Sequence, residues 1–428
     1  MHKTEESSAP PEPQAQAVAP SHSKKPLVIV SSWPPRLCGI ATFAEEALEF
    51  IRAHEPDRPV YVISHTDGRG ENVLPIIDTS RPDWYEPVAR EIRRLDPYAV
   101  HIEHEYGLYN YTDAQGRVDF NEGFLCLLQR LADIPTVVEP HTVHGRLRDE
   151  EEVFIRRLAD LCTILLFKCE YQKWRLEWTF AGRGWPMPHN IMIIPHGARP
   201  DKRWGADQID GLKDELGLGD LKGHHLVGLV GWIQNNKRWD IITRIWPEMY
   251  QKILEATSDE WVLFAAGEMR DPHHRRDYDL YLEEMRGLEK RHMGRFYPFI
   301  PRGDIYYKVM AICDFVVLPS IDETQSGTLA RIIALNKPYI TTAPMEGLSS
   351  QTVSSEGGLM FTDKGSLKRG IMRLSTSEKL RWKLGENLKR YLDGTVSWEV
   401  VAKKYYHAYE LASEAKAGRI SIDIPAEF

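Results

Sequence analysis

Residues 312–342 read ICDFVVLPSIDETQSGTLARIIALNKPYITT, in which two apolar runs enclose a polar turn and a helical pattern. The first run ends at Pro319, the helical pattern starts at Ser326, and the second run covers 338–342. Strands that read as unbroken apolar runs are typical of parallel sheets covered by helices on both faces. The segment therefore predicts a strand–helix–strand unit of an α/β fold.

The same alternation extends along the chain. Upstream apolar runs lie at 27–32, 59–63, 99–103, 135–138 and 191–195, and helical patterns between them include 41–54, 85–95 and 121–132. The rhythm restarts with strand patterns at 226–231 and 261–266 around a helix at 238–255. We expect two Rossmann-like α/β domains, 26–198 and 199–397, with a hinge within 197–222 and a ligand site in the cleft between them. A helix at 398–413 should pack back on the first domain, between polar tails at 1–25 and 414–428.

Composition narrows the classes of function. The 428 residues are too many for one core, and a net charge of -8 argues against binding to a nucleic-acid backbone. No apolar run approaches the ~20 residues of a membrane-spanning helix, so membrane contact should be peripheral at most. Five scattered cysteines without a C-x-x-C pair indicate reduced thiols in a cytoplasmic protein. The first 25 residues lack an apolar stretch and are typical of a disordered tail, not a signal peptide.

A dinucleotide-binding function is disfavoured by the first strand–turn. The turn reads PPRLCGIATF (34–43), which lacks the G-x-G-x-x-G fingerprint. By contrast, Ser326-Gly327-Thr328 opens a helix whose free N–H groups and positive dipole end suit a diphosphate. The alternative is a plain capped helix with Ser326 as its cap.

Six segments, in order, resemble the motifs of GT-B glycosyltransferases, specifically the retaining family 4. They are PPRLCGIATF (34–43), HIEHEYGLY (101–109), PTVVEPHTVHG (135–145), HNIMIIPHGARP (189–200), GWIQNNKRWD (231–240) and the segment 312–342. The resemblance covers about residues 27–410. It implies transfer of a hexose from a nucleotide-diphosphate sugar, such as GDP-mannose or UDP-glucose, with retention of configuration and without a metal or cofactor. The acceptor would be a carbohydrate, a lipid-linked compound or a small molecule.

The resemblance also implies three catalytic residues. Lys237 matches the lysine that pairs with the donor diphosphate, His141 the histidine that contacts the transferred sugar, and Glu323 the acid that holds sugar hydroxyls. Lys237 has an alternative interpretation as a solvated surface lysine. His141 and His144 together have metal-ligand spacing, but without further nearby ligands this is poor evidence for a metal site.

The donor nucleotide and diphosphate are expected at Gly39, Asn236, Lys237, Ser326, Gly327, Thr328 and Arg331. Two positions depart from the family: Trp232 stands where many members have arginine, and Arg331 where they have the second glutamate of the motif. Arg331 could reach a phosphate oxygen and replace the charge missing at Trp232, with Arg36 and Arg238 as other candidates. Alternatively Arg331 turns outward.

On the acceptor side, Glu103 and Glu105 follow a strand and are expected to face the cleft, unless they are solvated loop carboxylates. Residues 168–185 combine basic and aromatic side chains. We expect Trp174 and Trp178 to pack inward from one helix face, with docking at an anionic membrane as the alternative.

Two other functions stay open on the same fold. One is a sugar-nucleotide epimerase or phosphorylase. The other is a degenerate binding or scaffold protein, which the residues at Trp232 and Arg331 favour because expected charges are replaced there.

Overall fold

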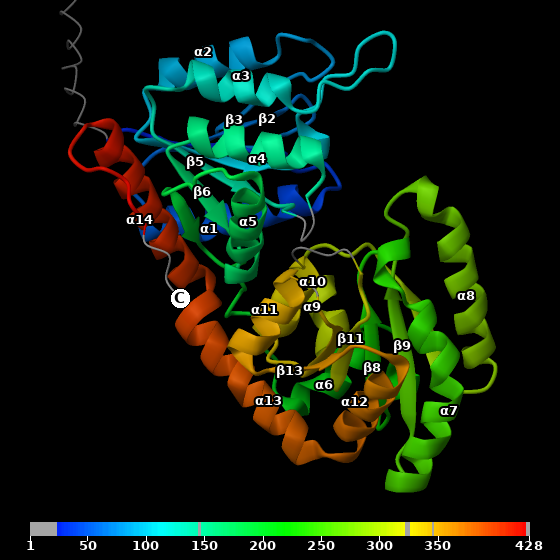
Figure 1. Ribbon diagram of the computed structural model, residues 1–428. Helices are drawn as coiled ribbons and strands as arrows, with labels where there is room; N and C mark the ends of the chain where they lie inside the picture. Colours follow the sequence, from blue (N-terminus) through cyan, green and yellow to red (C-terminus); the bar gives the residue numbers. More distant parts are fainter. Residues whose placement is uncertain (1–23, 144–146, 322–325, 345, 425–428) are drawn as a thin grey trace, which may run out of the picture.

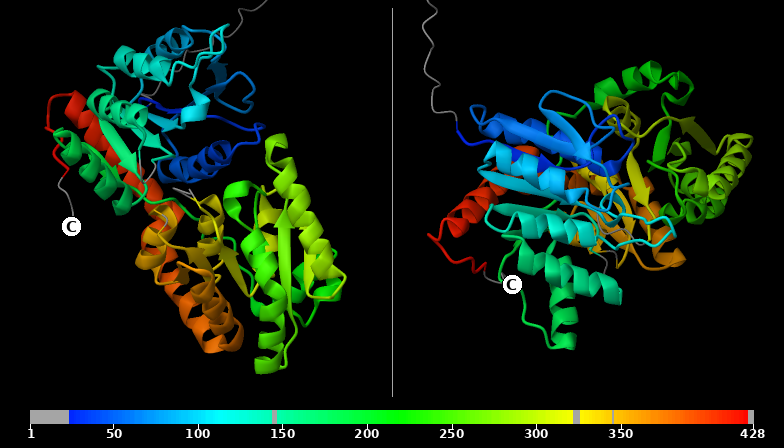
Figure 2. Two further views of the ribbon diagram at one scale, coloured as in Figure 1. Left: turned by 45° about the vertical axis from the view of Figure 1, so that its right-hand side comes forward. Right: turned by 90° about the horizontal axis from the view of Figure 1, so that it is seen from above.

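The computed structural model describes residues 24–143, 147–321, 326–344 and 346–424 of the chain. Two α/β domains lie one above the other, and a long helix from the end of the chain runs back along the first domain (Figure 1). The two parallel sheets confirm the predicted fold class. The turned views of Figure 2 show that the two domains are separate bodies joined along one side.

The first domain contains a seven-stranded parallel sheet in the order β3-β2-β1-β4-β5-β6-β7. Its strands are β1 (Leu27–Val30), β2 (Val60–His65), β3 (Val73–Ile77), β4 (Ala99–His104), β5 (Thr136–Pro140), β6 (Ile164–Phe167) and β7 (Ile191–Ile193). The helices are α1 (Gly39–His54), α2 (Tyr85–Leu95), α3 (Glu122–Arg130), α4 (Asp149–Leu161) and α5 (Glu170–Arg183), with a 3-10 turn η1 (Tyr106–Leu108) after β4. Strands β1, β4 and β6 are buried throughout because helices cover both faces of the sheet.

The second domain contains a six-stranded parallel sheet in the order β10-β9-β8-β11-β12-β13. Its strands are β8 (His225–Val230), β9 (Trp261–Gly267), β10 (Gly294–Pro298), β11 (Phe315–Leu318), β12 (Tyr339–Thr342) and β13 (Gly358–Phe361). The longer helices are α7 (Asp240–Thr257), α8 (Arg275–Glu289), α9 (Asp304–Ala311), α10 (Gly327–Ala334), α11 (Glu346–Ser355), α12 (Lys364–Thr376) and α13 (Glu378–Tyr391). A linker with α6 (Ile209–Glu215) and short turns η2 (Ala206–Gln208) and η3 (Gly219–Leu221) precedes β8, while η4 (Asn235–Lys237) and η5 (Pro272–His274) follow β8 and β9.

The last helix, α14 (Trp398–Lys416), follows a π-helical turn η6 (Leu392–Val396) and packs on α1 and on the sheet at β4 and β5. The ring of Trp398 lies at the hinge, where the Trp398 N–H donates to Ala198 O at 3.0 Å and the Ala198 N–H donates to Val396 O at 2.8 Å. A side chain at Gly197 would clash with that ring, since an added Cβ would lie 2.2 Å from it. The crossing of the chain between domains is therefore fixed by an aromatic ring packed against a glycine.

The segment 312–342 forms the expected unit, with β11 and β12 parallel neighbours joined through α10. Four strands were not predicted: β3, β6, β10 and β13. Among the described residues, no helix is both long and apolar enough to cross a bilayer. All five cysteines are free thiols.

Candidate functional site

A cavity of about 660 Å³ lies between the two domains and is lined by both. The first domain contributes the start of α1, the turn after β4 and the residues after β5. The second domain contributes the turn after β8 and the start of α10. The carboxyl ends of strands in both sheets thus meet at one cavity, which is where ligands bind in open α/β folds.

The amino end of α1 opens into this cavity at Gly39. The cap residue Cys38 makes no side-chain hydrogen bond to the helix, and the first turn has no acidic residue. A Cβ added at Gly39 would meet no protein atom within 4 Å, so protein packing does not require the glycine. Its effect is to leave the helix end bare toward the cavity, as an anion needs.

The opposite wall carries the donor-side residues Asn236, Lys237, Gly327 and Thr328. The backbone carbonyl of Asn236 accepts from the N–H of Ile321 at 2.8 Å, which ties the lysine turn to the end of β11. Thr328 is held by its hydroxyl, 2.8 Å from Tyr306 Oη. These four predicted donor residues therefore lie on one wall of the cavity.

Ser326 caps α10, with its hydroxyl accepting from the N–H of Leu329 at 3.3 Å. The side chain is buried and does not line the cavity. Gly231, at the end of β8, has a φ of 137°, and a Cβ there would lie 2.9 Å from Tyr306 Oη. A glycine is required at this position for the wall to close.

The three arginines expected to replace the missing charge are each engaged by a carboxylate. Arg36 contacts Asp67 at 2.8 Å, Arg238 contacts Asp240 at 3.1 Å and Arg331 contacts Glu46 at 2.7 Å. Two other arginines, Arg270 and Arg302, line the cavity and were not predicted. Among the described lining residues, Lys237 and these arginines stand beside two acidic residues, Glu46 and Glu105.

Arg331 neither turns outward nor stands unpaired before a phosphate. Its guanidinium reaches the other domain, donates to Gly327 O at 2.9 Å and stacks over Tyr306 at 4.8 Å. The Arg331 side chain is 8% exposed and that of its partner Glu46 is 16% exposed. The replacement at this position therefore forms an ion pair between α10 and α1 at the edge of the cavity.

His141 lines the cavity directly after β5. Its Nε2 lies 2.7 Å from Glu103 Oε2. The expectation that Glu103 faces the cleft is wrong, since its side chain is 2% exposed behind the histidine. Glu105 does line the cavity, and its carboxylate accepts from the Thr142 hydroxyl at 2.6 Å.

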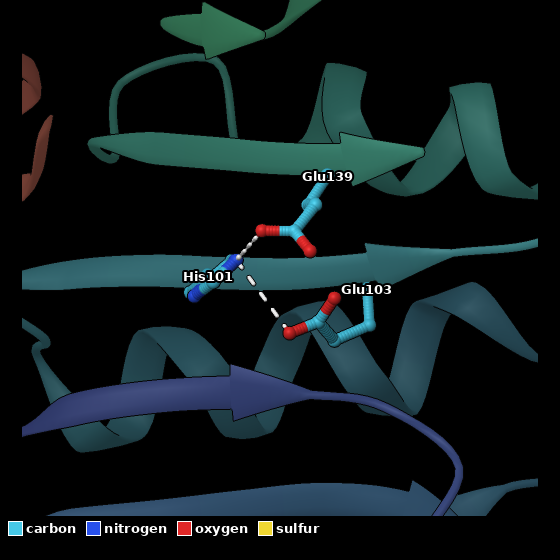
Figure 3. Close-up of side chains that lie close together, drawn as sticks. All are labelled: His101, Glu103 and Glu139. Atoms are coloured by element: carbon cyan, nitrogen blue, oxygen red, sulfur yellow. Dashed lines mark ion pairs between the residues drawn. The ribbon is translucent and has the colours of Figure 1, made fainter. Parts of the chain in front are cut away.

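Behind His141 lies a buried polar cluster on the face of β4 and β5 that α14 covers. Glu103 and Glu139 are register neighbours on these strands, and His101 precedes Glu103 by two residues on the same face. Figure 3 shows His101 between the two carboxylates, with Nε2 at 3.7 Å from Glu103 and 3.5 Å from Glu139. Lys168, after β6, forms an ion pair with Glu139, and Tyr405 Oη donates to that carboxylate at 2.8 Å.

The ligand atoms of His101, Glu103 and Glu139 lie within 4.8 Å of one another, the spacing of a metal site. However, the Lys168 ammonium already contacts Glu139, and His141 already contacts Glu103. Burial raises the pKa of Glu139, but the charge of Lys168 and the contact with His101 outweigh it and lower the pKa. Both carboxylates are thus already engaged by neighbouring side chains, and the buried ammonium of Lys168 does not fit a divalent cation.

His196 also lines the cavity and was not predicted. Burial, reinforced by the charge of Lys168, lowers the pKa of His196 to about 3, so the ring is neutral at pH 7. Its Nδ1 lies 2.7 Å from Gly197 O and must donate, which leaves Nε2 as an acceptor. The sequence feature that could have identified His196 as a cavity residue is its position in the interdomain segment IPHGARP.

Glu323 and His144 lie outside the described residues, so the proposed sugar contact of Glu323 stays a prediction. The expectation for Trp174 and Trp178 is wrong, because these side chains are 43% and 65% exposed. Helix α5 buries a different row: Gln172, Lys173, Leu176 and Phe180. A spacing of four places both tryptophans on one face but does not say which face is buried.

Two α/β domains with parallel sheets that meet at an interdomain cleft define the GT-B fold, as expected from the sequence. Residues 222–391 match the family model described as "Glycosyl transferases group 1". The match covers the second domain from just before β8 to the end of α13.

Among relatives, the chain is similar to glycosyltransferase 1 domain-containing protein 1 of Xenopus tropicalis, 24% identical over 229 residues. The match covers 53% of this chain and 62% of that protein, which is less than two thirds of its length. The fold is similar to HepE of Anabaena in complex with UDP, with a TM-score of 0.65, 14% identity, and 90% and 99% of the two chains covered. It is also similar to a sucrose-phosphate synthase from Thermosynechococcus elongatus, with a TM-score of 0.66, 15% identity, and 92% and 100% covered.

Proposed function

We propose that the chain transfers a hexose from a nucleotide-diphosphate sugar to an acceptor hydroxyl, with retention of configuration. One observation carries the proposal: Lys237 and the start of α10 in the second domain line the same cavity as His141 and Glu105 in the first. A diphosphate fits the first group because a lysine and helix N–H groups stabilise negative charge. A sugar and its acceptor fit the second group, His141 and Glu105, because these side chains offer polar atoms to hydroxyl groups. A cytoplasmic location remains a prediction.

In the proposed reaction the bond from the anomeric carbon to the β-phosphate oxygen breaks, and a bond to the acceptor oxygen forms on the same face. The acceptor proton passes to the departing β-phosphate, so no enzyme carboxylate needs to act as nucleophile. Lys237, Arg270 and the N–H groups of Gly327 and Thr328 stabilise the charge that develops on the diphosphate.

Glu103 acts as a positioning residue for His141. An ionised carboxylate can only accept hydrogen bonds, so His141 Nε2 carries the proton of this contact. The fixed ring then holds the sugar, with Glu323 proposed to hold its hydroxyls. His196 Nε2 and Glu105 are acceptors for further hydroxyl groups.

The test incubates the purified chain with UDP-glucose or GDP-mannose and a panel of acceptor alcohols, and measures release of nucleoside diphosphate. The anomeric configuration of the product is then read by NMR. We expect product with retained configuration, formed equally in the presence of EDTA. An inverted product would overturn retention, and loss in EDTA with recovery on Mg²⁺ or Mn²⁺ would overturn metal independence.

A second function, binding without turnover, has one observation in its favour. The ion pair between Arg331 and Glu46 occupies the edge of the cavity, and Trp232 lines the wall where a cation was expected. A folded chain that binds a nucleoside diphosphate but releases none from any donor would establish this function and exclude the transferase.

A further inference from the structure

A second cavity of about 650 Å³ lies where α5, α11 and α14 meet, and the residues 420–424 that follow α14 form part of its wall. Figure 1 shows these three helices together beside the end of the chain. The cavity shares no lining residue with the interdomain cleft. It therefore requires an explanation of its own, independent of the proposed transfer.

The walls combine apolar and basic side chains. The apolar part comes from β7, α14 and the end of the chain: Ile191, Met192, Ile193, Leu411, Ile420 and Ile422. The basic part includes Lys173 of α5 and Lys404 of α14, which approach from two different helices. Such a surface is amphiphilic, with cations beside an apolar channel.

Neither of these ammonium groups forms a hydrogen bond or an ion pair with another residue in the described part of the chain. Lys173 is 8% exposed, yet no hydrogen bond or ion pair joins it to another described residue. Lys404 is half-buried, also without such a partner, and burial alone lowers its pKa. A desolvated ammonium without a counter-charge is destabilising, and a bound anion would relieve that cost.

A third group points to a ligand. Gln351 of α11 lines the cavity and is 3% exposed, but neither its amide nitrogen nor its amide oxygen has a hydrogen-bond partner. The Tyr391 phenol lies beside this amide without making a hydrogen bond of good geometry. Buried amides are nearly always satisfied, so an orphaned one that faces a cavity indicates a polar partner from outside the chain.

The cavity is also lined by one further lysine and two carboxylates. Lys168 is paired with Glu139, and Asp423 lies 3.4 Å from His189. Glu170, in the first turn of α5, and Asp423 are the acidic residues that line the cavity with Lys173 and Lys404. The amino end of α5 also opens here, with Cys169 as a cap that makes no side-chain hydrogen bond to the helix.

We propose that this cavity binds an amphiphile with a small anionic head group, such as an alkyl phosphate. Lys173, Lys404 and the Gln351 amide hold the head group. The alkyl chain lies against Ile191, Ile193 and Leu411. The site is separate from the cleft and does not depend on the reaction there.

The probe is n-dodecyl phosphate below its micelle concentration, titrated calorimetrically into the full chain. We expect saturable binding to one site. Inorganic phosphate should bind much more weakly because it lacks the alkyl chain, and dodecyl maltoside because it lacks the anionic head group. Lys404→Gln and Gln351→Leu should each weaken binding by about tenfold, the usual worth of a hydrogen bond to a charged group. Circular dichroism verifies that each variant folds.

Lys403→Gln is the matched control. Lys403 is the preceding residue of α14 but lines a different groove, with Tyr98 and Tyr406, so its replacement should leave binding unchanged. Equal affinity in wild type, Lys404→Gln and Gln351→Leu, or equal loss in Lys403→Gln, would overturn the site. So would the absence of binding by wild type. Binding of UDP in the cleft, measured in parallel, should not change in any of these variants.

A second arm identifies the source of the amphiphile. Vesicles of phosphatidylcholine with phosphatidic acid are sedimented with wild type and with Lys404→Gln. Sedimentation that depends on Lys404 would assign the head group to a bilayer lipid. Equal behaviour of both proteins, with dodecyl phosphate binding intact, would assign the site to a free amphiphile.

Discussion

His141 Nε2 lies 2.7 Å from Glu103 Oε2, and the two side chains are 11% and 2% exposed. The histidine thus lines the cleft while the carboxylate that orients it is out of reach of substrate. A fixed acceptor behind one ring nitrogen sets both the tautomer and the orientation of the other side of the ring. Glu103 should therefore affect turnover without affecting nucleotide binding.

The first prediction tests whether Glu103 affects turnover without affecting nucleotide binding. Glu103→Gln keeps the shape of the side chain but removes the charge that His141 contacts, so kcat should fall on the order of 10–100-fold, as for a lost charge-assisted hydrogen bond. The Kd for UDP should stay within about twofold of wild type, because the residues proposed to hold the diphosphate lie on the opposite wall, and the pH profile of kcat should shift. Glu103→Asp, which restores the charge, should recover part of the activity. A variant with wild-type kcat and pH profile would show that the contact is merely structural.

Position 103 shows what the sequence could and could not reveal. The alternation in HIEHE places His101 and Glu103 on one face of β4, and that much was readable. The sequence did not reveal which face of β4 is directed toward the cleft, because helices cover both faces and all six residues of β4 are buried. The partner carboxylate, Glu139, comes from β5, and its neutralising Lys168 comes from beyond β6. Only the sheet order brings these residues together.

The strands that were not predicted from the sequence were missed for local reasons. The run of β6 follows α4 after only two residues, Cys162 and Thr163, so helix and strand merge into one apolar stretch. Strand β10 reads GRFYP and is not fully buried at any position, so it has no apolar run to detect. By contrast, 312–342 was readable because β11 is wholly buried and Ser326 caps the helix that follows.

The second prediction concerns stability. Lys168→Met leaves Glu139 buried without its main counter-charge, which should lower the free energy of unfolding by about 3–5 kcal/mol at pH 7.5. The chain with both Lys168→Met and Glu139→Gln should recover much of this loss. Urea unfolding of the wild type, of Lys168→Met and of the double variant measures these changes in the free energy of unfolding.

The pH dependence of that loss follows from the direction of the pKa shift. In the wild type the pKa of Glu139 lies below its ordinary value of 4.5, so its contribution to stability is fully present above that pH and is lost as pH falls through the lower value. Without Lys168 we expect burial, the largest single influence on Glu139, to raise its pKa, so that the folded state is penalised as pH rises above 4.5. The difference between wild type and Lys168→Met should therefore grow from pH 4.5 to 7.5. A difference independent of pH would contradict the ion-pair explanation.

The third prediction concerns Lys237. A charge-assisted contact that strengthens as the diphosphate leaves should be worth about 2.7–4 kcal/mol, so Lys237→Ala should lose on the order of 10²–10³ in kcat. Lys252→Ala is the control, because Lys252 is an exposed lysine of α7 paired with Glu248 at 2.9 Å and lies away from the cavity lining. Wild-type kcat in a folded Lys237→Ala chain would remove this residue from the mechanism.

The last prediction concerns the contact of Arg331 with Glu46. The ion pair joins α10 of one domain to α1 of the other at 2.7 Å, and both side chains are mostly buried. A double-mutant cycle with Arg331→Met and Glu46→Gln should give a coupling free energy of about 1–3 kcal/mol in urea unfolding. The neighbouring pair Arg302–Glu45 is the matched control. Its charged atoms are 3.6 Å apart and 30% and 51% exposed, and its coupling should stay below about 1 kcal/mol.

The same variants decide whether Arg331 also serves the diphosphate. If the guanidinium only ties the domains together, Glu46→Gln and Arg331→Met should weaken UDP and uridine binding equally. If it also contacts a phosphate oxygen, Arg331→Met should weaken UDP much more than uridine, with a steep salt dependence, whereas Glu46→Gln should leave UDP binding intact or strengthen it by releasing the guanidinium. Because Glu46 already holds the guanidinium, we expect the first outcome, with Kd changes for UDP and uridine that agree within about twofold. A loss confined to UDP in Arg331→Met would show that the arginine is shared between the carboxylate and the donor.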